Sequence, residues 1–394
     1  MTQQALPVRL RASSGSSTAA DAVEAGVAAA TDAIAGLDGA TPALIIVYAT
    51  VRYDLPELLR AIRTVTGDAP LVGESTAGQL ANGTLMKPGS GVSVLAMTAG
   101  DYRFGFGCVE HLSETGGVAA GRELARTARA GIGPDGTPFA TLMIFTDGLA
   151  NEQQTLVTGL HQVTGAAIPV VGGAAADDRH LSETFVFFGD QALSDAAVAV
   201  WIGSDHPIPV SVGHGWHSIG LPLLVTKTDG QVVEEIAGRP AYDVFDEHIR
   251  RGNADETDHL RPGGYYSTHA FGMIEPDGSH LIRGVFMTDD RIHTFSPLPV
   301  YAAVQIMGCN PEDLLTMSRD VAKRAIGDRN PSLMLVFSCI ARMDILKDRA
   351  AEEAAVLQEV AGDVPTFGVY TYGEFARTTS VAGYHNATVA AIAL

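Results

Sequence analysis

An order of structural signals that returns three times is the feature of this sequence that most constrains its fold. Each copy contains a short apolar run, an amphipathic helical stretch, a glycine and then a Pro-x-x-Gly segment. The apolar runs are typical of buried strands, and a glycine is common where a helix ends. The runs are 44–48, 142–145 and 333–337, and the Pro-x-x-Gly segments begin at Pro70, Pro169 and Pro365. A strand, a helix and a second strand in this order predict a βαβ unit with two parallel strands.

The repeated order extends beyond the Pro-x-x-Gly segments. Each copy ends in one further expected strand, at 92–97, 197–202 and 388–394. A strand and a helix also precede the second copy (102–109 and 117–130) and the third copy (291–298 and 311–325). We therefore expect an α/β fold in which repeated βαβ units form mixed, mainly parallel sheets with helices packed on them, in duplicated halves.

Composition excludes several classes of protein. The 394 residues allow two or three domains, and the formal net charge of −19 disfavours nucleic acid and anionic membranes as partners. No apolar run approaches the roughly 18 residues of a membrane span. The three widely spaced cysteines favour a reducing compartment. We expect a cytoplasmic protein.

Two segments lack the patterns of packed structure. Residues 1–17 have no apolar core of the kind that a signal peptide carries, and we expect a disordered N-terminal arm there. Residues 248–264 are charged, show no apolar periodicity and end in Pro-Gly-Gly. We expect a linker between two domains at 248–264.

Loops at the carboxyl ends of the predicted strands form the expected ligand site, because ligands of βαβ sheets bind at that edge. The loops after the Pro-x-x-Gly strands are small, polar and acidic, which leaves room for a ligand and supplies charge. The candidate residues in them are Ser75, Thr76, Gly173, Asp177, Asp178, Tyr370, Tyr372 and Glu374. The alternative is that the small residues make tight turns and the acids cap helices.

Further candidates lie in the third copy. Arg342 follows its first strand, where a guanidinium can bind a carboxylate through two parallel hydrogen bonds. His385 and Asn386 open the final strand and lie within reach of the same edge. Together with Glu374 these residues suit a zwitterion of amino-acid type. The alternative is that Arg342 and Glu374 pair with each other. Cys339, beside Arg342, is expected to be a buried structural cysteine.

Signatures of catalysis and metal binding are weak in this sequence. The segment 73–78 resembles a nucleophile elbow but has one residue too many before its second glycine. There is no Walker loop, no His-Glu-x-x-His and no Cys-x-x-Cys. His214 and His217 form the one close histidine pair, and we expect these two to be structural or exposed. We expect no catalytic residue, no metal site and no bound cofactor.

The chain resembles the FIST N and FIST C domain family from about residue 43 to 394. The segments that carry the resemblance begin at Pro70 (PLVGESTAGQ), Pro169 (PVVGGAAADD), Gly220 (GLPLLVT), Gly368 (GVYTYGE) and His385 (HNAT). The resemblance implies a FIST N domain over 18–247 and a FIST C domain over 265–394. Family members often have a cysteine and a glutamate where this chain has Glu74 and Gln79.

The family resemblance implies an intracellular sensory module for small ligands such as amino acids. No kinase, cyclase or methyl-accepting region is recognised in the chain, so the signal is expected to pass to another protein, such as a histidine kinase. One alternative is a haem-bound nitric-oxide sensor, with His214 or His217 as the axial ligand. Another is an enzyme that uses Arg342, Glu374 and His385 on a small metabolite. A visible spectrum separates the haem alternative from the other two.

Overall fold

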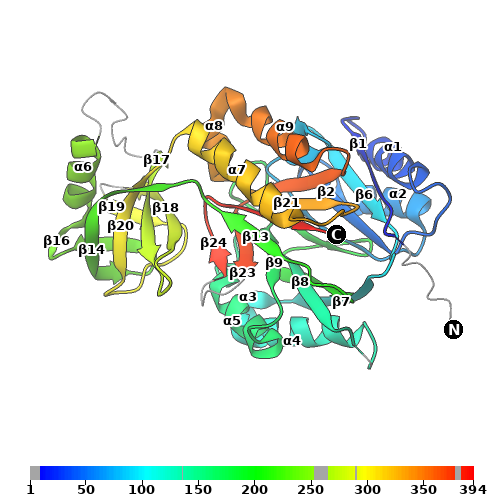
Figure 1. Ribbon diagram of the computed structural model, residues 1–394, viewed down its shortest axis with the longest axis horizontal. Helices are drawn as coiled ribbons and strands as arrows, with labels where there is room; N and C mark the ends of the chain where they lie inside the picture. The colour runs from blue at the N-terminus through cyan, green and yellow to red at the C-terminus, as the bar shows by residue number, and fades with distance from the viewer. Residues whose placement is uncertain (1–8, 135, 253–264, 289–290, 378–382) are drawn as a thin grey trace.

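Three units with the same order of elements form the body of the protein, and a small β-barrel lies beside it (Figure 1). The computed structural model describes residues 9–134, 136–252, 265–288, 291–377 and 383–394. The units correspond to the copies found in the sequence. The described part of the chain therefore has three units, and a division into duplicated halves is not found.

Each unit runs strand, helix, strand, helix, strand, hairpin and final strand. Unit 1 contains β1 (Ala12–Ser17), α1 (Ala22–Ala35), β2 (Leu44–Ala49), α2 (Leu55–Thr66), β3 (Leu71–Ser75), β4 (Gln79–Ala81), β5 (Thr84–Met86) and β6 (Val92–Met97). Unit 2 contains β7 (Arg103–Glu110), α3 (Leu112–Thr115), α4 (Gly117–Ala130), β8 (Phe139–Thr146), α5 (Gln153–Thr164), β9 (Val170–Ala174), β10 (Val186–Phe188), β11 (Gln191–Leu193) and β12 (Ala196–Ser204). Unit 3 contains β13 (Val210–Gly213), α7 (Pro311–Ile326), β21 (Met334–Cys339), α8 (Ile340–Leu346), a 3-10 turn (Lys347–Arg349), α9 (Ala350–Ala361), β22 (Thr366–Thr371), β23 (Gly373–Arg377), β24 (Tyr384–His385) and β25 (Val389–Ala393).

The strands of each unit follow one order in their sheet. The orders are β1-β6-β2-β3, β7-β12-β8-β9 and β13-β25-β21-β22. The parallel pairs predicted from the βαβ pattern are present, as β2 with β3, β8 with β9 and β21 with β22. The sheets are mixed, but the expectation of mainly parallel sheets is wrong. The final strand of each unit returns beside the first apolar strand in the opposite direction.

Each sheet is completed by a hairpin from another unit. The hairpin β10–β11 of unit 2 pairs with β3 of unit 1, and β23–β24 of unit 3 pairs with β9 of unit 2. The hairpin β4–β5 of unit 1 pairs with β22 of unit 3. The exchange is therefore cyclic, and each six-stranded sheet belongs to two units.

The three apolar runs at Leu44, Leu142 and Leu333 form buried strands, as the repeat predicts. Every residue of β2 and β21 is buried, and so are the last six residues of β8. Strands that are buried on both faces read as continuous apolar runs, because helices cover one face and a second sheet the other. Helices of the three units cover three sides of the body in Figure 1. The inner faces of all three sheets share one apolar core.

Helix α2 illustrates how the sequence sets the limits of these helices. Asp54 caps its N-terminus by accepting a hydrogen bond from the N–H of Glu57 (2.9 Å). Gly67 ends the helix with a φ of 63°, which glycine adopts without strain. Between these ends, Leu58, Leu59 and Ile62 face the core.

The barrel is closed and antiparallel, in the order β14-β20-β17-β18-β19-β15 and back to β14. Its elements are β14 (His217–Asp229), β15 (Val232–Ile236), β16 (Arg239–Pro240), α6 (Ala241–Gly252), β17 (Tyr265–Ile274), β18 (His280–Thr288), β19 (Arg291–Thr294) and β20 (Ala303–Gly308). It is inserted into unit 3 between β13 and α7. The strand expected at 291–298 to lead unit 3 is β19 of the barrel, and β13 takes the leading position.

The predicted linker 248–264 lies between elements of this one barrel. Residues 248–252 belong to α6, and 253–264 lie outside the described residues. Barrel strands precede and follow the segment in the chain. The segment therefore falls inside one folded unit.

The predicted disordered arm 1–17 contains a strand. Residues 1–8 lie outside the described residues, whereas β1 pairs with β6 along its whole length. Small residues permit this packing, because a Cβ on Gly15 would lie 2.2 Å from the carbonyl oxygen of Ala29 in α1. The sequence missed the strand because four of its six residues are serines.

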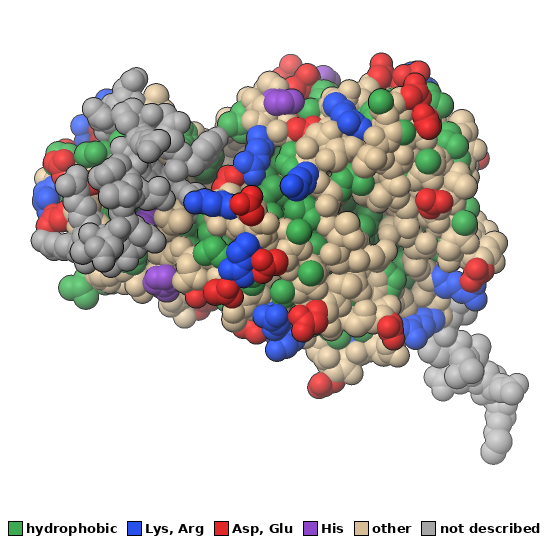
Figure 2. All heavy atoms as spheres, turned by 90° about the horizontal axis from the view of Figure 1, so that it is seen from above, with side chains coloured by type: hydrophobic (Ala, Val, Ile, Leu, Met, Phe, Trp, Pro, Cys, Tyr) green, Lys and Arg blue, Asp and Glu red, His purple; other side chains and the backbone are tan. Residues whose placement is uncertain are grey.

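The barrel forms a lobe beside the body (Figure 1), and acidic and basic side chains are interspersed over the face of the body that Figure 2 shows. Contacts to the end of the chain attach the barrel. Trp216 donates to Ala387 O (3.2 Å), and Arg283 donates to Tyr384 O (3.3 Å). Within the described residues, no helix has both the length and the apolar character that crossing a bilayer requires.

Candidate functional site

Three chain segments meet where β3, β9 and β22 end, and we call this place the three-loop junction (residues 75–78, 173–178 and 370–374). Three equivalent backbone hydrogen bonds join the segments. Ala176 N–H donates to Ser75 O (2.9 Å), Tyr372 N–H to Ala174 O (2.9 Å) and Ala77 N–H to Tyr370 O (3.0 Å). Each segment donates to one neighbour and accepts from the other, so the bonds form a closed ring.

The junction brings together eight of the eleven residues that the sequence predicts as a ligand site. They are Ser75, Thr76, Gly173, Asp177, Asp178, Tyr370, Tyr372 and Glu374. All of them are buried except Asp178 and Tyr372, which are half-buried. The cyclic hairpin exchange causes this convergence, because it places each loop beside a strand of another unit.

The two aspartates of the junction tie loops together. Asp177 accepts hydrogen bonds from the N–H groups of residues 181–183 and from the hydroxyl of Tyr372. Burial raises the pKa of Asp177, but these hydrogen bonds outweigh burial and lower the pKa below its usual value. Asp178 accepts from the N–H groups of Val51 (3.0 Å) and Gly89 (2.6 Å). Both carboxylates hold loops in place, and neither caps a helix, which was the alternative that the sequence left open.

Glu374 is the fully buried acid of the unit 3 segment. Its Oε1 accepts from Thr371 (2.8 Å), and its Oε2 accepts from the hydroxyl (2.7 Å) and the N–H (3.2 Å) of Thr388. Burial raises the pKa of Glu374 to about 8, although these hydrogen bonds act in the opposite direction. Glu374 therefore carries a proton over much of the neutral pH range.

Glu74 is a second fully buried acid, on β3 of unit 1. Neither of its carboxyl oxygens has a hydrogen-bond partner in the described part of the chain. A Cβ added to Gly173 would lie 2.7 Å from Glu74 Oε1, so the carboxyl group occupies the space that glycine leaves on β9. Burial raises the pKa of Glu74 well above its usual value, and the charge of Glu374 raises it further.

Tyr48 lies beside Glu74 on the neighbouring strand, in parallel register with it. Its hydroxyl is fully buried and likewise has no hydrogen-bond partner among the described residues. Burial and the nearby Glu74 raise the pKa of this hydroxyl. The ring is stacked on Phe367, with 4.9 Å between the centroids, and packs edge-on against Phe145. Packing against these two rings thus fixes the position of the Tyr48 side chain.

Arg342 lies in a different cluster, within unit 3. Its guanidinium is fully buried and pairs with Glu353 of α9 at 2.6 Å. It also donates to Ser318 Oγ (2.7 Å) and to two backbone carbonyls, those of His214 and Leu314 (both 3.1 Å). Its donors are therefore committed within the protein. The alternative, that Arg342 and Glu374 pair with each other, is wrong, because Glu353 takes that place. The expectation that Arg342 shares one site with Glu374 is wrong as well, because its guanidinium lies in this separate cluster.

His385 and Asn386 lie next to the junction, where the barrel meets the body. His385 pairs with Glu374 in the β23–β24 ladder, and its Nε2 donates to Ala376 O (2.8 Å). Burial lowers the pKa of His385 to about 4. Asn386 accepts a hydrogen bond from Ser296 of the barrel (3.3 Å). Cys339 is buried beside Glu374, and burial raises the pKa of its thiol.

His214 and His217 do not fit the role of haem ligand. His214 Nδ1 accepts from the N–H of Trp216 (2.8 Å), so Nε2 of the neutral ring carries the proton and lacks the lone pair that binds iron. His217 Nδ1 lies 3.3 Å from Asp313, which leaves Nε2 free, but a Cβ on Gly308 would lie 3.2 Å from this Nε2. That nitrogen therefore lies against the backbone of β20.

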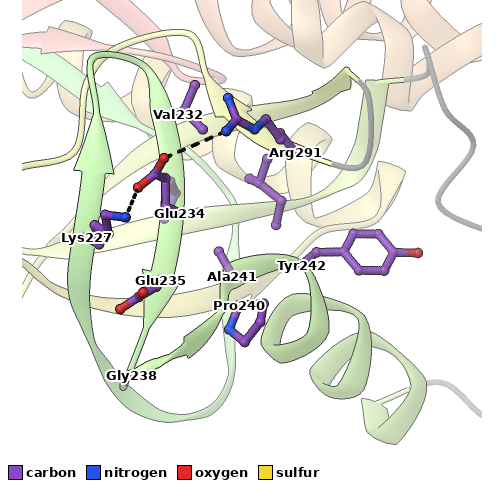
Figure 3. Close-up of a pocket in the computed structure, with 11 residues that line it drawn as sticks. Lys227, Val232, Glu234, Glu235, Gly238, Pro240, Ala241, Tyr242 and Arg291 are labelled. Carbon is purple, nitrogen blue, oxygen red and sulfur yellow. Dashed lines mark ion pairs between the residues drawn. The ribbon is translucent and has the colours of Figure 1, made fainter.

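A pocket of about 290 Å³ lies on the barrel, away from the residues predicted from sequence (Figure 3). Lys227 and Arg291 reach Glu234 from two sides, at 2.9 Å and 3.9 Å. The pocket is open to solvent, so these ion pairs stabilise little. Its cationic groups are already engaged with a carboxylate.

The proton on Glu374 makes a testable contribution to stability. The folded state raises the pKa of this acid from 4.5 to about 8, so it binds the proton more tightly than the unfolded chain does. The resulting stabilisation is complete below about pH 4.5 and is lost as the pH rises through about 8. We expect the melting temperature of Glu374→Gln, relative to wild type, to rise across this range, because the amide does not titrate. Parallel melting profiles of the two proteins would contradict the raised pKa.

The sequence missed three important groups: Glu74 as a site residue, Tyr48, and Glu353 as the partner of Arg342. Glu74 had a usable signal, because an acid at the end of an otherwise apolar strand is rarely buried without a role. Tyr48 gave no signal beyond one more apolar position in a buried run. Glu353 is separated from Arg342 by a 3-10 turn, so helical spacing does not relate the two.

Comparisons with known proteins connect this chain to other sequences. An uncharacterized protein of Mycobacterium tuberculosis is 26% identical over 96% of this chain and 97% of its own length. Uncharacterized proteins of Methanocaldococcus jannaschii and Mycobacterium bovis are 24% and 28% identical, and the matches span 43% and 55% of their lengths. This chain therefore spans about half the length of the latter two.

One solved structure covers nearly the whole chain. Cyanuric acid hydrolase from A. caulinodans is 10% identical over 98% of this chain and 99% of its own, with a TM-score of 0.35. A TM-score this low does not establish a shared fold.

Two domain families match the chain and cover most of it. The FIST N domain matches residues 43–239, and the FIST C domain matches residues 241–377. The boundary between the matches lies immediately before α6 of the barrel. With both domains present in this order, the chain belongs to the FIST family.

Proposed function

We propose that this protein is an intracellular sensor that binds a small, amino-acid-like ligand at the three-loop junction and signals through a separate partner protein. FIST domains are associated with sensory roles in signal transduction. The observation that carries the proposal is the meeting of segments from all three units around two fully buried carboxyl groups, Glu74 and Glu374. A ligand that separates one pair of segments alters the contacts of every unit, because the three bonds form a ring.

The proposal is one of binding without a catalytic step. A cysteine nucleophile reacts as its thiolate, and burial raises the pKa of Cys339. Arg342, which the enzyme alternative also needs, is fully buried and paired with Glu353 inside unit 3, in a different cluster from Glu374. These features favour a binding protein over an enzyme. We propose a cytoplasmic location and a histidine kinase or another signalling protein as the partner.

A thermal-shift screen of amino acids and related small metabolites tests the proposed function. We expect at least one compound to raise the melting temperature, since a ligand at 100 times its Kd adds about 2.7 kcal/mol. Calorimetry of that compound with Glu374→Gln is expected to show at least about a tenfold weaker affinity, because the amide cannot lose a proton to form a charge-assisted contact with the ligand. The matched control is Glu359→Gln, an exposed acid 3.4 Å from Arg319.

Two results of this screen decide against the proposal. One is a ligand whose affinity is the same for wild type and Glu374→Gln, which places the site elsewhere. The other is turnover of the compound during the measurement, detected by chromatography, which makes the protein an enzyme.

A further inference from the structure

Three oxygen atoms beside the three-loop junction lack hydrogen-bond partners among the described residues. They are Glu74 Oε1, Glu74 Oε2 and Tyr48 Oη. Both side chains have no exposed surface, and they stand side by side in parallel register on β3 and β2. Unpartnered polar atoms in a protein interior are costly, and those of native proteins generally have an explanation.

The titratable groups that interact with Glu74 among the described residues are acids. Tyr48 of β2 lies on one side, and Glu374 of β23 acts on Glu74 through its charge. Beyond Glu374 lie Cys339 of β21 and Tyr384 of β24, whose pKa values are also raised, first by burial and then by Glu374. A carboxylate in such surroundings has no counter-charge, so Glu74 holds a proton when the site is empty.

The chemistry missing from this cluster is a cation that donates several hydrogen bonds. A proton on Glu74 supplies one donor and the Tyr48 hydroxyl a second, but neither group brings a positive charge to the cluster. A primary ammonium group supplies a positive charge and three donors on one small nitrogen.

We propose that Glu74 is the residue that recognises the ligand, and that it takes a primary ammonium group in exchange for its own proton. This inference rests on the proposed function, since it concerns the same site. In the exchange, the neutral carboxylic acid of Glu74 and a free ammonium group give a carboxylate–ammonium pair and one proton released to solvent. Gly173 permits the arrangement, because any side chain there would fill the space of the Glu74 carboxyl group.

The source of the ammonium group is either the free ammonium ion or the amine of a small metabolite. Both share the N–H donors that the cluster lacks, whereas potassium has a similar size and charge but no donor. Binding of potassium as strong as that of ammonium would therefore indicate a simple charge site and overturn the inference.

The test is calorimetry of the full chain near pH 7 in two buffers that contain no primary amine and differ in ionisation enthalpy. The probes are ammonium chloride, methylammonium chloride, glycine and potassium chloride. We expect about one proton to be released for each ammonium group bound. Glu74→Gln is expected to abolish the release and to weaken binding at least about tenfold, because the carboxamide keeps the shape and loses the charge.

The outcomes separate this inference from the proposed function. If Glu374→Gln weakens binding and Glu74→Gln leaves it unchanged, the sensor site stands but the proposed role of Glu74 is overturned. Binding without proton release also overturns the exchange. If none of the ammonium probes binds, the inference is overturned. If the screen then finds a ligand without an amine, the proposed function still stands. Thermal unfolding of Glu74→Gln checks its fold.

Discussion

Replacing Gly172 by alanine is expected to lower the free energy of unfolding by about 3–5 kcal/mol, the range of the most damaging single substitutions. Gly172 is the glycine of the second Pro-x-x-Gly segment, and its φ of 153° is one that residues with a side chain rarely adopt. A Cβ there would lie 1.9 Å from the carbonyl oxygen of Ile144 on the neighbouring strand β8. The two strands would have to separate, which disturbs a parallel pair in the core.

The midpoint of urea unfolding measures this effect. Gly73 provides an internal replicate, because it has the same φ and its Cβ would lie 1.9 Å from Val47 O. Gly165→Ala is the matched control, since its φ of 62° is also positive but its Cβ would meet no atom within 4 Å. The control is expected to cost about 1 kcal/mol from backbone conformation alone. Similar losses at Gly172 and Gly165 would show that close strand packing is not the cause.

Replacing Arg342 by methionine is expected to destabilise the protein by about 3–5 kcal/mol, because it leaves the buried charge of Glu353 without its counter-ion. Burial raises the pKa of Glu353, but the charge of Arg342 and the hydrogen bonds from Tyr370 and Ser318 outweigh it and keep the acid ionised. Ser338 and Tyr370 also donate to Glu353, at 3.0 Å and 2.5 Å. These donors cannot replace a full positive charge.

A second substitution distinguishes the loss of a counter-charge from the loss of packing. Arg342→Met combined with Glu353→Met removes both charges, and we expect it to recover much of the lost stability in urea unfolding. Arg319→Met, at an exposed pair with Glu359, is the control and is expected to change stability far less. A double variant that is less stable than Arg342→Met would contradict the account. In that case the volume and hydrogen bonds of the two side chains would matter more than their charges.

The fold could be predicted from the sequence wherever apolar pattern and glycine position act locally. The strands at Leu44, Leu142 and Leu333, their helices and their parallel partners all follow from residues a few positions apart. The pairing of the hairpins does not, because Gln79 and Val369 come together across nearly 300 residues of chain. Nothing in either segment specifies its distant partner. The expectation of mainly parallel sheets failed for another reason: the final strand of each unit returns antiparallel to the first apolar strand, and the apolar pattern does not specify strand direction.

The site could be predicted in part. The loops of the three copies were expected at one edge, and they do meet, because equivalent positions in repeated units occupy equivalent places in space. The roles of individual side chains depend on neighbours that the sequence does not reveal. Asp177 binds backbone N–H groups of its own loop, and Arg342 finds Glu353, whereas Glu74 remains without a partner among the described residues. The burial of a side chain and its hydrogen-bond and ion-pair partners decide whether it is charged, and both arise only in the assembled fold.

Because the hairpins are exchanged cyclically, the repeat seen in the sequence is not the unit that can fold. Each repeat is recognisable along the chain, yet no repeat forms a complete six-stranded sheet by itself. Two strands at the edge of every such sheet come from another repeat. A repeat released from the other two would expose the backbone edge of β3, β9 or β22 to any passing strand. The three repeats must therefore stay on one chain and reach the native state together. Such an arrangement tolerates change in the loops but resists the loss, gain or shuffling of a single repeat.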